Sequence, residues 1–133
     1  MANSQLNRVV VTGLGAITPI GNNLTEYWES LLSGRNGISS ITLFDASKHA
    51  CRIAGEVKNF DPFDFLPKKE GKRMDRFAQF GVITSKQALA DSGLEINDLN
   101  ADDIGVLIGT GVGGLKTLED QHEIVLNRGP GRC

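Results

Sequence analysis

The sequence has few of the features that mark several common protein classes. Its 133 residues include only two cysteines, Cys51 and Cys133, too few for the disulfide network of a small secreted domain. No stretch approaches the ~20 apolar residues of a membrane span, and the N-terminus lacks a signal-peptide pattern. Lys and Arg total 14 against 16 Asp and Glu, a net charge of −2. We therefore expect a reducing compartment, with neither nucleic acid nor a membrane as the main partner.

Candidate catalytic groups are also scarce. His49 and His122 have no Cys, Asp or Glu around them at the spacing of a metal site. Cys51 lacks the turn of a nucleophile elbow, and Cys133 has no following residues that could form an oxyanion hole. We expect both thiols to be inert, and we identify no catalytic residue and no metal ligand.

The apolar pattern predicts an α/β arrangement. Runs of β-branched and aliphatic residues at 8–14 and 104–108 are typical of short strands buried on both faces of a parallel sheet. A further strand is expected over 52–57. Apolar residues recurring every three or four positions predict helices over 24–32, 70–91 and 115–128. The apolar face of the helix over 70–91 is so wide that we expect cover on several sides.

A glycine-rich stretch lies between the second predicted strand and the last helix. Gly109, Gly111 and Gly114 match the G-x-G-x-x-G pattern of dinucleotide-binding proteins. That pattern also needs an acidic residue about 20 positions further on, and no acid follows Glu123. The glycines would equally allow a strand and a helix to meet closely, or an acyl ligand to approach the backbone. A nucleotide-dependent oxidoreductase stays open as an alternative function.

A basic segment precedes the long helix. Residues 68–76 hold five basic and two acidic side chains, a local charge of +3. Basic residues at a helix N-terminus oppose the macrodipole, so helix stability does not account for them. Four of them are expected to share one side of the helix, at positions i, i+3, i+4 and i+7: Lys69, Lys72, Arg73 and Arg76. With Arg128 and Arg132 near the end of the chain, they favour an acidic macromolecular partner over a merely solvated helix start.

Six sequence motifs stand in a characteristic order and spacing: Arg8-Val-Val-Val-Thr-Gly-Leu-Gly15, Pro19-Ile-Gly-Asn22, Leu32-Ser-Gly34 with Gly37-Ile38, Phe44-Asp45, Lys72-Arg-Met-Asp-Arg-Phe77, and Gly105 through Gly114-Leu115. Together they resemble the start of the condensing enzymes called type II 3-oxoacyl-(acyl-carrier-protein) synthases. The resemblance extends over all 133 residues and is to cyanobacterial or plastid sequences, which implies bacterial cytoplasm or plastid stroma.

The resemblance implies a thiolase-like α/β fold made of two halves, of which residues 1–133 would be an incomplete first half. The family's nucleophilic cysteine and both active-site histidines would lie beyond Cys133, so this chain alone is expected to be inactive. The implied reaction is fatty acid elongation by decarboxylative Claisen condensation of an acyl-enzyme thioester with malonyl-acyl-carrier protein. It needs no cofactor, and the full-length enzyme is expected to be a homodimer.

Individual residues also match family positions. Val112 matches a position that lines and gates the acyl-chain pocket, where a β-branched side chain is stiff. Lys69, Lys72, Arg73 and Arg132 match positions that meet the acidic helix of the acyl carrier protein. Gly131 departs from the family, where a basic residue often stands beside Arg132. A noncatalytic, chain-length-factor-like or carrier-protein-binding partner with the same fold is the main alternative function.

Overall fold

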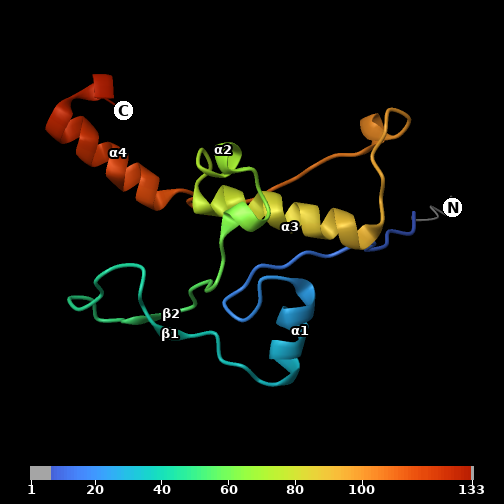
Figure 1. The fold of residues 1–133 in the computed structure, drawn as a ribbon, viewed down its shortest axis with the longest axis horizontal. Helices are drawn as coiled ribbons and strands as arrows, with labels where there is room; N and C mark the ends of the chain where they lie inside the picture. The colour runs from blue at the N-terminus through green and yellow to red at the C-terminus, as the bar shows by residue number, and fades with distance from the viewer. Residues whose placement is uncertain (1–6, 133) are drawn as a thin grey trace, which may run out of the picture.

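The computed structural model describes residues 7–132, so Cys133 lies outside the described part (Figure 1). Helices and short strands are joined by long irregular segments. In chain order the elements are α1 (Leu24–Leu32), β1 (Ser39–Ser40), β2 (Ile53–Ala54), η1 (Pro62–Asp64), α2 (Lys68–Gly71), α3 (Arg76–Ser92), η2 (Ala101–Asp103), α4 (Leu115–Arg128) and η3 (Pro130–Arg132).

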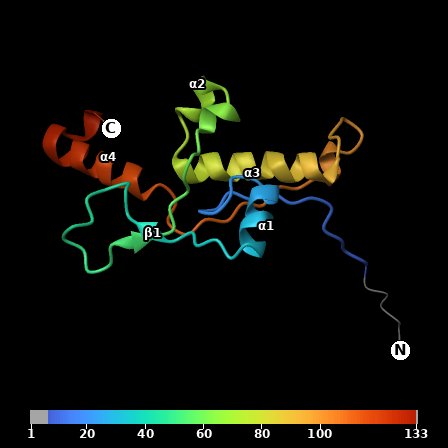
Figure 2. The ribbon, with the colours of Figure 1, turned by 60° about the horizontal axis from the view of Figure 1, so that its bottom comes forward.

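Helix α3 is the element around which the others are arranged (Figures 1 and 2). Its Ile83 is 1% exposed, the most buried large side chain among the described residues. The helix ends at Gly93, whose φ of 64° is the left-handed conformation that suits glycine. Only Ala46 and Leu66 join Ile83 as fully buried apolar residues in the described part, so the core is small.

Helix α1 confirms the prediction for 24–32. The Asn23 side chain accepts a hydrogen bond from the Glu26 amide at 2.9 Å, which satisfies one free donor of the first turn. The Glu26 carboxylate in turn accepts from the Asn22 amide at 2.9 Å. At the buried side of the helix, the Ser30 hydroxyl donates to the Ile20 carbonyl at 2.6 Å and fixes α1 to the preceding loop.

The helix predicted over 70–91 is wrong in one respect, because it is broken into α2 and α3. Asp75 has extended backbone angles, φ −64° and ψ 156°, and interrupts the helical path. Gly71 is buried against the Phe63 ring, which holds α2 away from the axis of α3. The Gln79 side chain donates to the Gly71 and Met74 carbonyls at 2.8 and 3.2 Å, so the break leaves these acceptors satisfied.

The two predicted parallel strands are not formed. Residues 8–14 and 104–108 are extended, yet in the described part neither is hydrogen-bonded into a sheet. Val9 is 90% and Leu107 98% exposed, far from the double burial expected of them. A strand forms only by hydrogen bonding to at least one neighbouring strand, and the described residues supply none for either segment. The sheet that does form is the antiparallel pair β1–β2, so the strand expected over 52–57 has two residues.

The first extended segment, residues 8–16, lies directly on α3. The Leu14 amide donates to Asp91 at 2.9 Å, and the Ala16 amide donates to Gln87 at 2.9 Å. A Cβ atom at Gly13 would overlap the Ala88 carbonyl oxygen and lie 2.5 Å from the Ser92 nitrogen. Glycine is therefore required there for the segment to approach the helix backbone.

Many apolar side chains around this scaffold are exposed, among them Val10 at 61%, Trp28 at 59% and Val106 at 79%. They outnumber the buried apolar side chains, so the described residues leave many apolar groups uncovered.

The helices within residues 7–132 are too short or too polar for any of them to span a lipid bilayer.

Candidate functional site

The glycine loop, residues 109–114, leads from the second extended segment (residues 104–108) into α4. Val112 in this loop is 75% exposed. A Cβ atom added at Gly109 or Gly111 would meet nothing within 4 Å. Before the loop, Gly81 of α3 faces Ile108. The loop thus presents an apolar, stiff side chain in open space between two points of attachment to α3.

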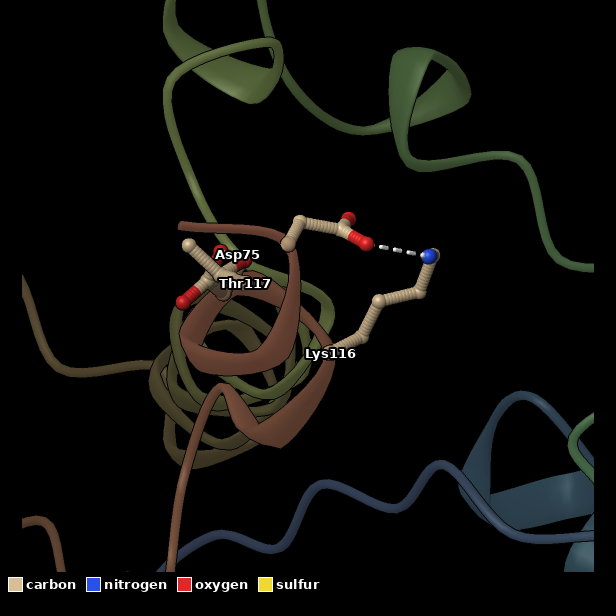
Figure 3. Close-up of polar contacts among 4 residues, drawn as sticks. Asp75, Lys116 and Thr117 are labelled. Atoms are coloured by element: carbon tan, nitrogen blue, oxygen red, sulfur yellow. Dashed lines mark hydrogen bonds and ion pairs between the residues drawn. The ribbon is translucent and has the colours of Figure 1, made fainter. Parts of the chain in front are cut away.

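The end of the loop is held against the start of α3. Gly113, with φ 78°, faces the Phe77 ring, where a Cβ atom would lie 3.3 Å from two ring carbons. The Asp75 carboxylate accepts a hydrogen bond from the Thr117 hydroxyl at 2.5 Å, and Figure 3 shows these two side chains together. A Cβ atom at Gly114 would overlap the other oxygen of the same carboxylate. Asp75 therefore touches both the last residue of the glycine loop and the first turn of α4.

Lys116 lies beside this contact but takes no part in it (Figure 3). Its ammonium pairs with Asp120 one turn further on, at 3.0 Å. The hydrogen bond to that carboxylate raises the pKa of Lys116. Both side chains are largely exposed, at 85% and 53%, so the pair contributes little to stability.

Three of the predicted basic residues form an exposed group, which we call the basic turn: Lys69 on α2, and Lys72 and Arg73 directly after it. None of the three is in an ion pair with another described residue. Arg76 does not join them, contrary to the predicted single helical side, because the break at 72–75 turns it elsewhere. Its guanidinium lies 5.3 and 5.0 Å from the centres of the Phe60 and Phe80 rings and donates to the Val57 carbonyl at 3.1 Å.

Arg132 is placed by η3, which follows α4, and is exposed. In both views α2 lies beside the N-terminal end of α3, and α4 extends beyond that same end (Figures 1 and 2). The structure thus puts the basic turn and Arg132 on separate elements toward one end of the molecule. Val112 lies in the loop that enters α4, whereas Arg132 lies beyond the other end of that 14-residue helix.

Cys51 and His49, judged inert from the sequence, take no part in this site. Cys51 is exposed, and its sulfur lies 3.5 Å from the Ile53 carbonyl oxygen. His49 packs edge-on against Phe44, with ring centres 5.4 Å apart. Within residues 7–132 no three His, Cys, Asp or Glu side chains come close enough to hold a metal ion.

Two carboxylates with defined partners were missed by the sequence reasoning. Glu56 is 7% exposed and accepts from the Thr42 hydroxyl at 2.7 Å and from the Thr42 and Leu43 amides. These hydrogen bonds, led by that of the hydroxyl, lower the pKa of Glu56. Asp75 is the second of these carboxylates. The sequence signal that could have identified it is its place inside the motif Lys72-Arg-Met-Asp-Arg-Phe77. Glu56 had no comparable signal.

Solved structures with a similar fold are ketosynthases. A beta-ketoacyl synthase from Burkholderia phymatum has a TM-score of 0.73 and 27% identity over 93% of this chain and 31% of its own. A ketosynthase in complex with its type II PKS acyl-carrier protein has a TM-score of 0.71 and 25% identity, over 90% and 30%. The predicted fold class, a thiolase-like α/β fold present in part, is therefore confirmed, although its two strands are unpaired here.

The chain belongs to the beta-ketoacyl synthase family, because the model named Beta-ketoacyl synthase, N-terminal domain, matches residues 6–130. The 3-oxoacyl-[acyl-carrier-protein] synthase 2 of Synechocystis sp. is 65% identical over 133 residues, which are 100% of this chain and 32% of the relative. That of Staphylococcus aureus strain N315 is 47% identical over 129 residues, 97% of this chain and 31% of the relative. The chain thus spans about a third of the length of these relatives.

Family membership also overturns the alternative hypothesis that the chain is a nucleotide-dependent oxidoreductase. The G-x-G-x-x-G match follows an unpaired extended segment, not a strand, so the context of a dinucleotide site is missing in the described residues. The glycines belong instead to a ketoacyl synthase N-terminal domain. At Gly114 the lack of a side chain admits the Asp75 carboxylate.

Proposed function

We propose that this chain is the N-terminal part of a 3-oxoacyl-(acyl-carrier-protein) synthase that elongates fatty acids. The reaction is a decarboxylative Claisen condensation, in which an acyl-enzyme thioester is attacked by the carbanion formed from malonyl-carrier protein. The observation that carries the proposal is the 65% identity to the Synechocystis synthase across all 133 residues. No cofactor enters the reaction.

The chemistry itself belongs to residues that this chain does not contain. An activated thiol needs a base or a lowered pKa, and the exposed Cys51 is not hydrogen-bonded to either histidine. We therefore propose that the chain supplies the acyl-pocket residue Val112 and part of the carrier-protein surface. The nucleophilic cysteine and the two histidines come from sequence that follows residue 133 in the full-length enzyme.

The basic turn is the proposed docking surface for the acyl carrier protein. Lys69, Lys72 and Arg73 are exposed and unpaired among the described residues, so their charges are available to an acidic partner. Arg132 extends this surface on η3. The ketosynthase that was solved with its acyl-carrier protein supports a partner of this kind.

Val112 is the proposed wall of the acyl pocket. Its side chain is apolar and stiff, and Gly109 and Gly111 before it leave space for an acyl chain. The full-length enzyme is proposed to be a homodimer located in bacterial cytoplasm or plastid stroma.

The coding sequence that follows residue 133 provides the first test. A downstream Thr-Ala-Cys nucleophile elbow and two histidines are expected. A continuation that lacks this cysteine would overturn the proposal and favour the noncatalytic, chain-length-factor-like alternative.

A chimera provides the functional test. In it, this chain replaces the matching third of the Synechocystis synthase, and turnover of acyl- and malonyl-carrier protein is measured. Activity comparable to that of the unaltered synthase is expected, because 65% of the exchanged residues are identical. A folded chimera that binds carrier protein but forms no 3-oxoacyl product would contradict the proposal.

A further inference from the structure

Asp75 connects the start of α3 to the first turn of α4 through Thr117, which lies 42 positions further along the chain. It precedes α3, yet its carboxylate makes no capping hydrogen bond to the first turn of that helix. The carboxylate is turned to the start of α4 instead, where it accepts from Thr117 and lies against Gly114. The side chain therefore serves α4 and the glycine loop, not its own helix.

Helix α4 lacks the features that usually stabilise a helix start. Its N-cap is Gly114, which has no side chain to accept a hydrogen bond, and its first turn contains no acidic residue. A negative charge near a helix N-terminus is favourable because it complements the macrodipole. Asp75 supplies that charge from another element, and Thr117 in the first turn of α4 fixes its position.

The glycine loop is held by contacts at its two ends. A Cβ atom at Gly109 or Gly111 would meet nothing within 4 Å, so the middle of the loop has open space on that side. The restraints lie at Ile108, which faces Gly81, and at Gly113 and Gly114, which face Phe77 and Asp75. Val112 directly precedes these last two contacts.

We propose that Asp75 is a positioning residue that sets the place of Val112, and with it the acyl lengths the pocket accepts. It does so through Thr117 and Gly114, without touching the substrate. The inference rests on the proposed function, because it assigns Asp75 a part in the selectivity of the same pocket.

The test uses the chimera and two substitutions that remove the contact from either side, Thr117→Val and Asp75→Ala. Thr117→Ser keeps the hydroxyl and is the conservative variant. Thr25→Val is the matched control, since Thr25 is also exposed in the first turn of a helix and far from the loop. The readout is the ratio of kcat/KM for a long acyl-carrier protein to that for a short one.

We expect Thr117→Val and Asp75→Ala each to change this ratio by about fivefold, the size of effect that loss of a hydrogen bond to a charged group allows. The double variant should change it no more than one single variant does, because both remove the same contact. Thr117→Ser and Thr25→Val should leave the ratio unchanged. A purely structural role would lower turnover for all acyl lengths alike, and that result would overturn the proposal.

A second measurement does not depend on activity. Amide hydrogen exchange of residues 111–118 in the chimera should become faster in Thr117→Val and stay unchanged in Thr117→Ser and Thr25→Val. If the chimera shows this pattern but forms no product, the proposed function fails and the positioning of the loop by Asp75 stands. If exchange is unchanged in Thr117→Val, the positioning role is overturned whatever the activity.

Discussion

The two extended segments that flank α3 have similar sequences and are held very differently. Residues 8–16 lie on the helix backbone, with two amide hydrogen bonds to α3 side chains and with Gly13 packed against the Ala88 carbonyl. The segment that ends at Ile108 approaches α3 at Gly81, and the glycine loop after it is open at Gly109 and Gly111. Glycine thus has two uses in this chain.

In the first segment glycine removes a side chain so that two pieces of backbone can meet. In the second it leaves space beside Val112, and contact returns only where Asp75 and Phe77 hold the loop end. The first segment is therefore suited to fixing the scaffold. The second is suited to presenting a residue to a ligand.

The largest expected effect comes from a feature that both segments share. In the described part neither segment has a partner strand. The free 133-residue chain should be aggregated or molten, because the exposed Val9, Val106 and Leu107 promote association. Binding of the dye ANS and a weak near-UV CD signal would be the signs, and no condensing activity is expected. A cooperative melt of a monodisperse 14.3 kDa monomer would contradict this and favour a self-contained binding module.

The next effect separates the two uses of glycine directly. Gly13→Ala in the chimera should lower stability by about 3 kcal/mol or more, because the added methyl group would overlap the α3 backbone. Gly109→Ala, which meets nothing within 4 Å, is the matched control and should melt within a few degrees of the unaltered chimera. Equal losses in both variants would show that the second segment is as tightly packed as the first.

A third experiment asks whether the basic turn beside the glycine loop belongs to binding. Lys72→Glu with Arg73→Glu in the chimera should raise the KM for acyl-carrier protein by about tenfold, since reversed charges weaken the encounter with an acidic partner. Added salt should weaken binding by the unaltered chimera. A small acyl-pantetheine substrate should be handled as before, because it lacks the acidic helix.

The control for this experiment reverses two charges elsewhere. Lys48→Glu with Lys86→Glu changes the net charge equally at exposed positions outside the basic turn. This pair should leave the KM for acyl-carrier protein nearly unchanged. If the reversal in the basic turn impairs pantetheine and carrier-protein substrates alike, the turn supports the fold and does not bind the partner.

The sequence predicted local features better than those that depend on distant partners. Helix α1 was predictable because its cap, Asn23, and its apolar spacing are both local. The break before α3 was not, because it depends on Gly71 packing against Phe63 and on Gln79 reaching back to satisfy the freed carbonyls. The strand predictions for 8–14 and 104–108 failed because a strand is completed by its neighbours, which the described residues do not provide.

The candidate site shows the same contrast between features that are local in sequence and features that depend on distant residues. Val112, Lys69, Lys72, Arg73 and Arg132 were named from their resemblance to family positions, and their roles stay predictions. Asp75 was passed over because its carboxylate acts on residues 42 positions away, a distance that no helical or strand period connects. Only the fold places Asp75 beside Gly114 and Thr117.

The smallest expected effect is a change of selectivity with little loss of stability. Val112→Phe in the chimera should shorten the accepted acyl chains, because a larger ring in the pocket costs about 1–3 kcal/mol for the substrates that reach it. Stability should change little, since Val112 is 75% exposed and a Cβ atom at the preceding Gly111 would meet nothing within 4 Å. Val10→Phe in the first extended segment is the matched control and should leave the product-length profile unchanged, because the segment that carries Val10 is scaffold. If Val112→Phe leaves the profile unchanged, Val112 does not face the acyl chain. If Val10→Phe alters the profile, the division of labour between the two segments is wrong.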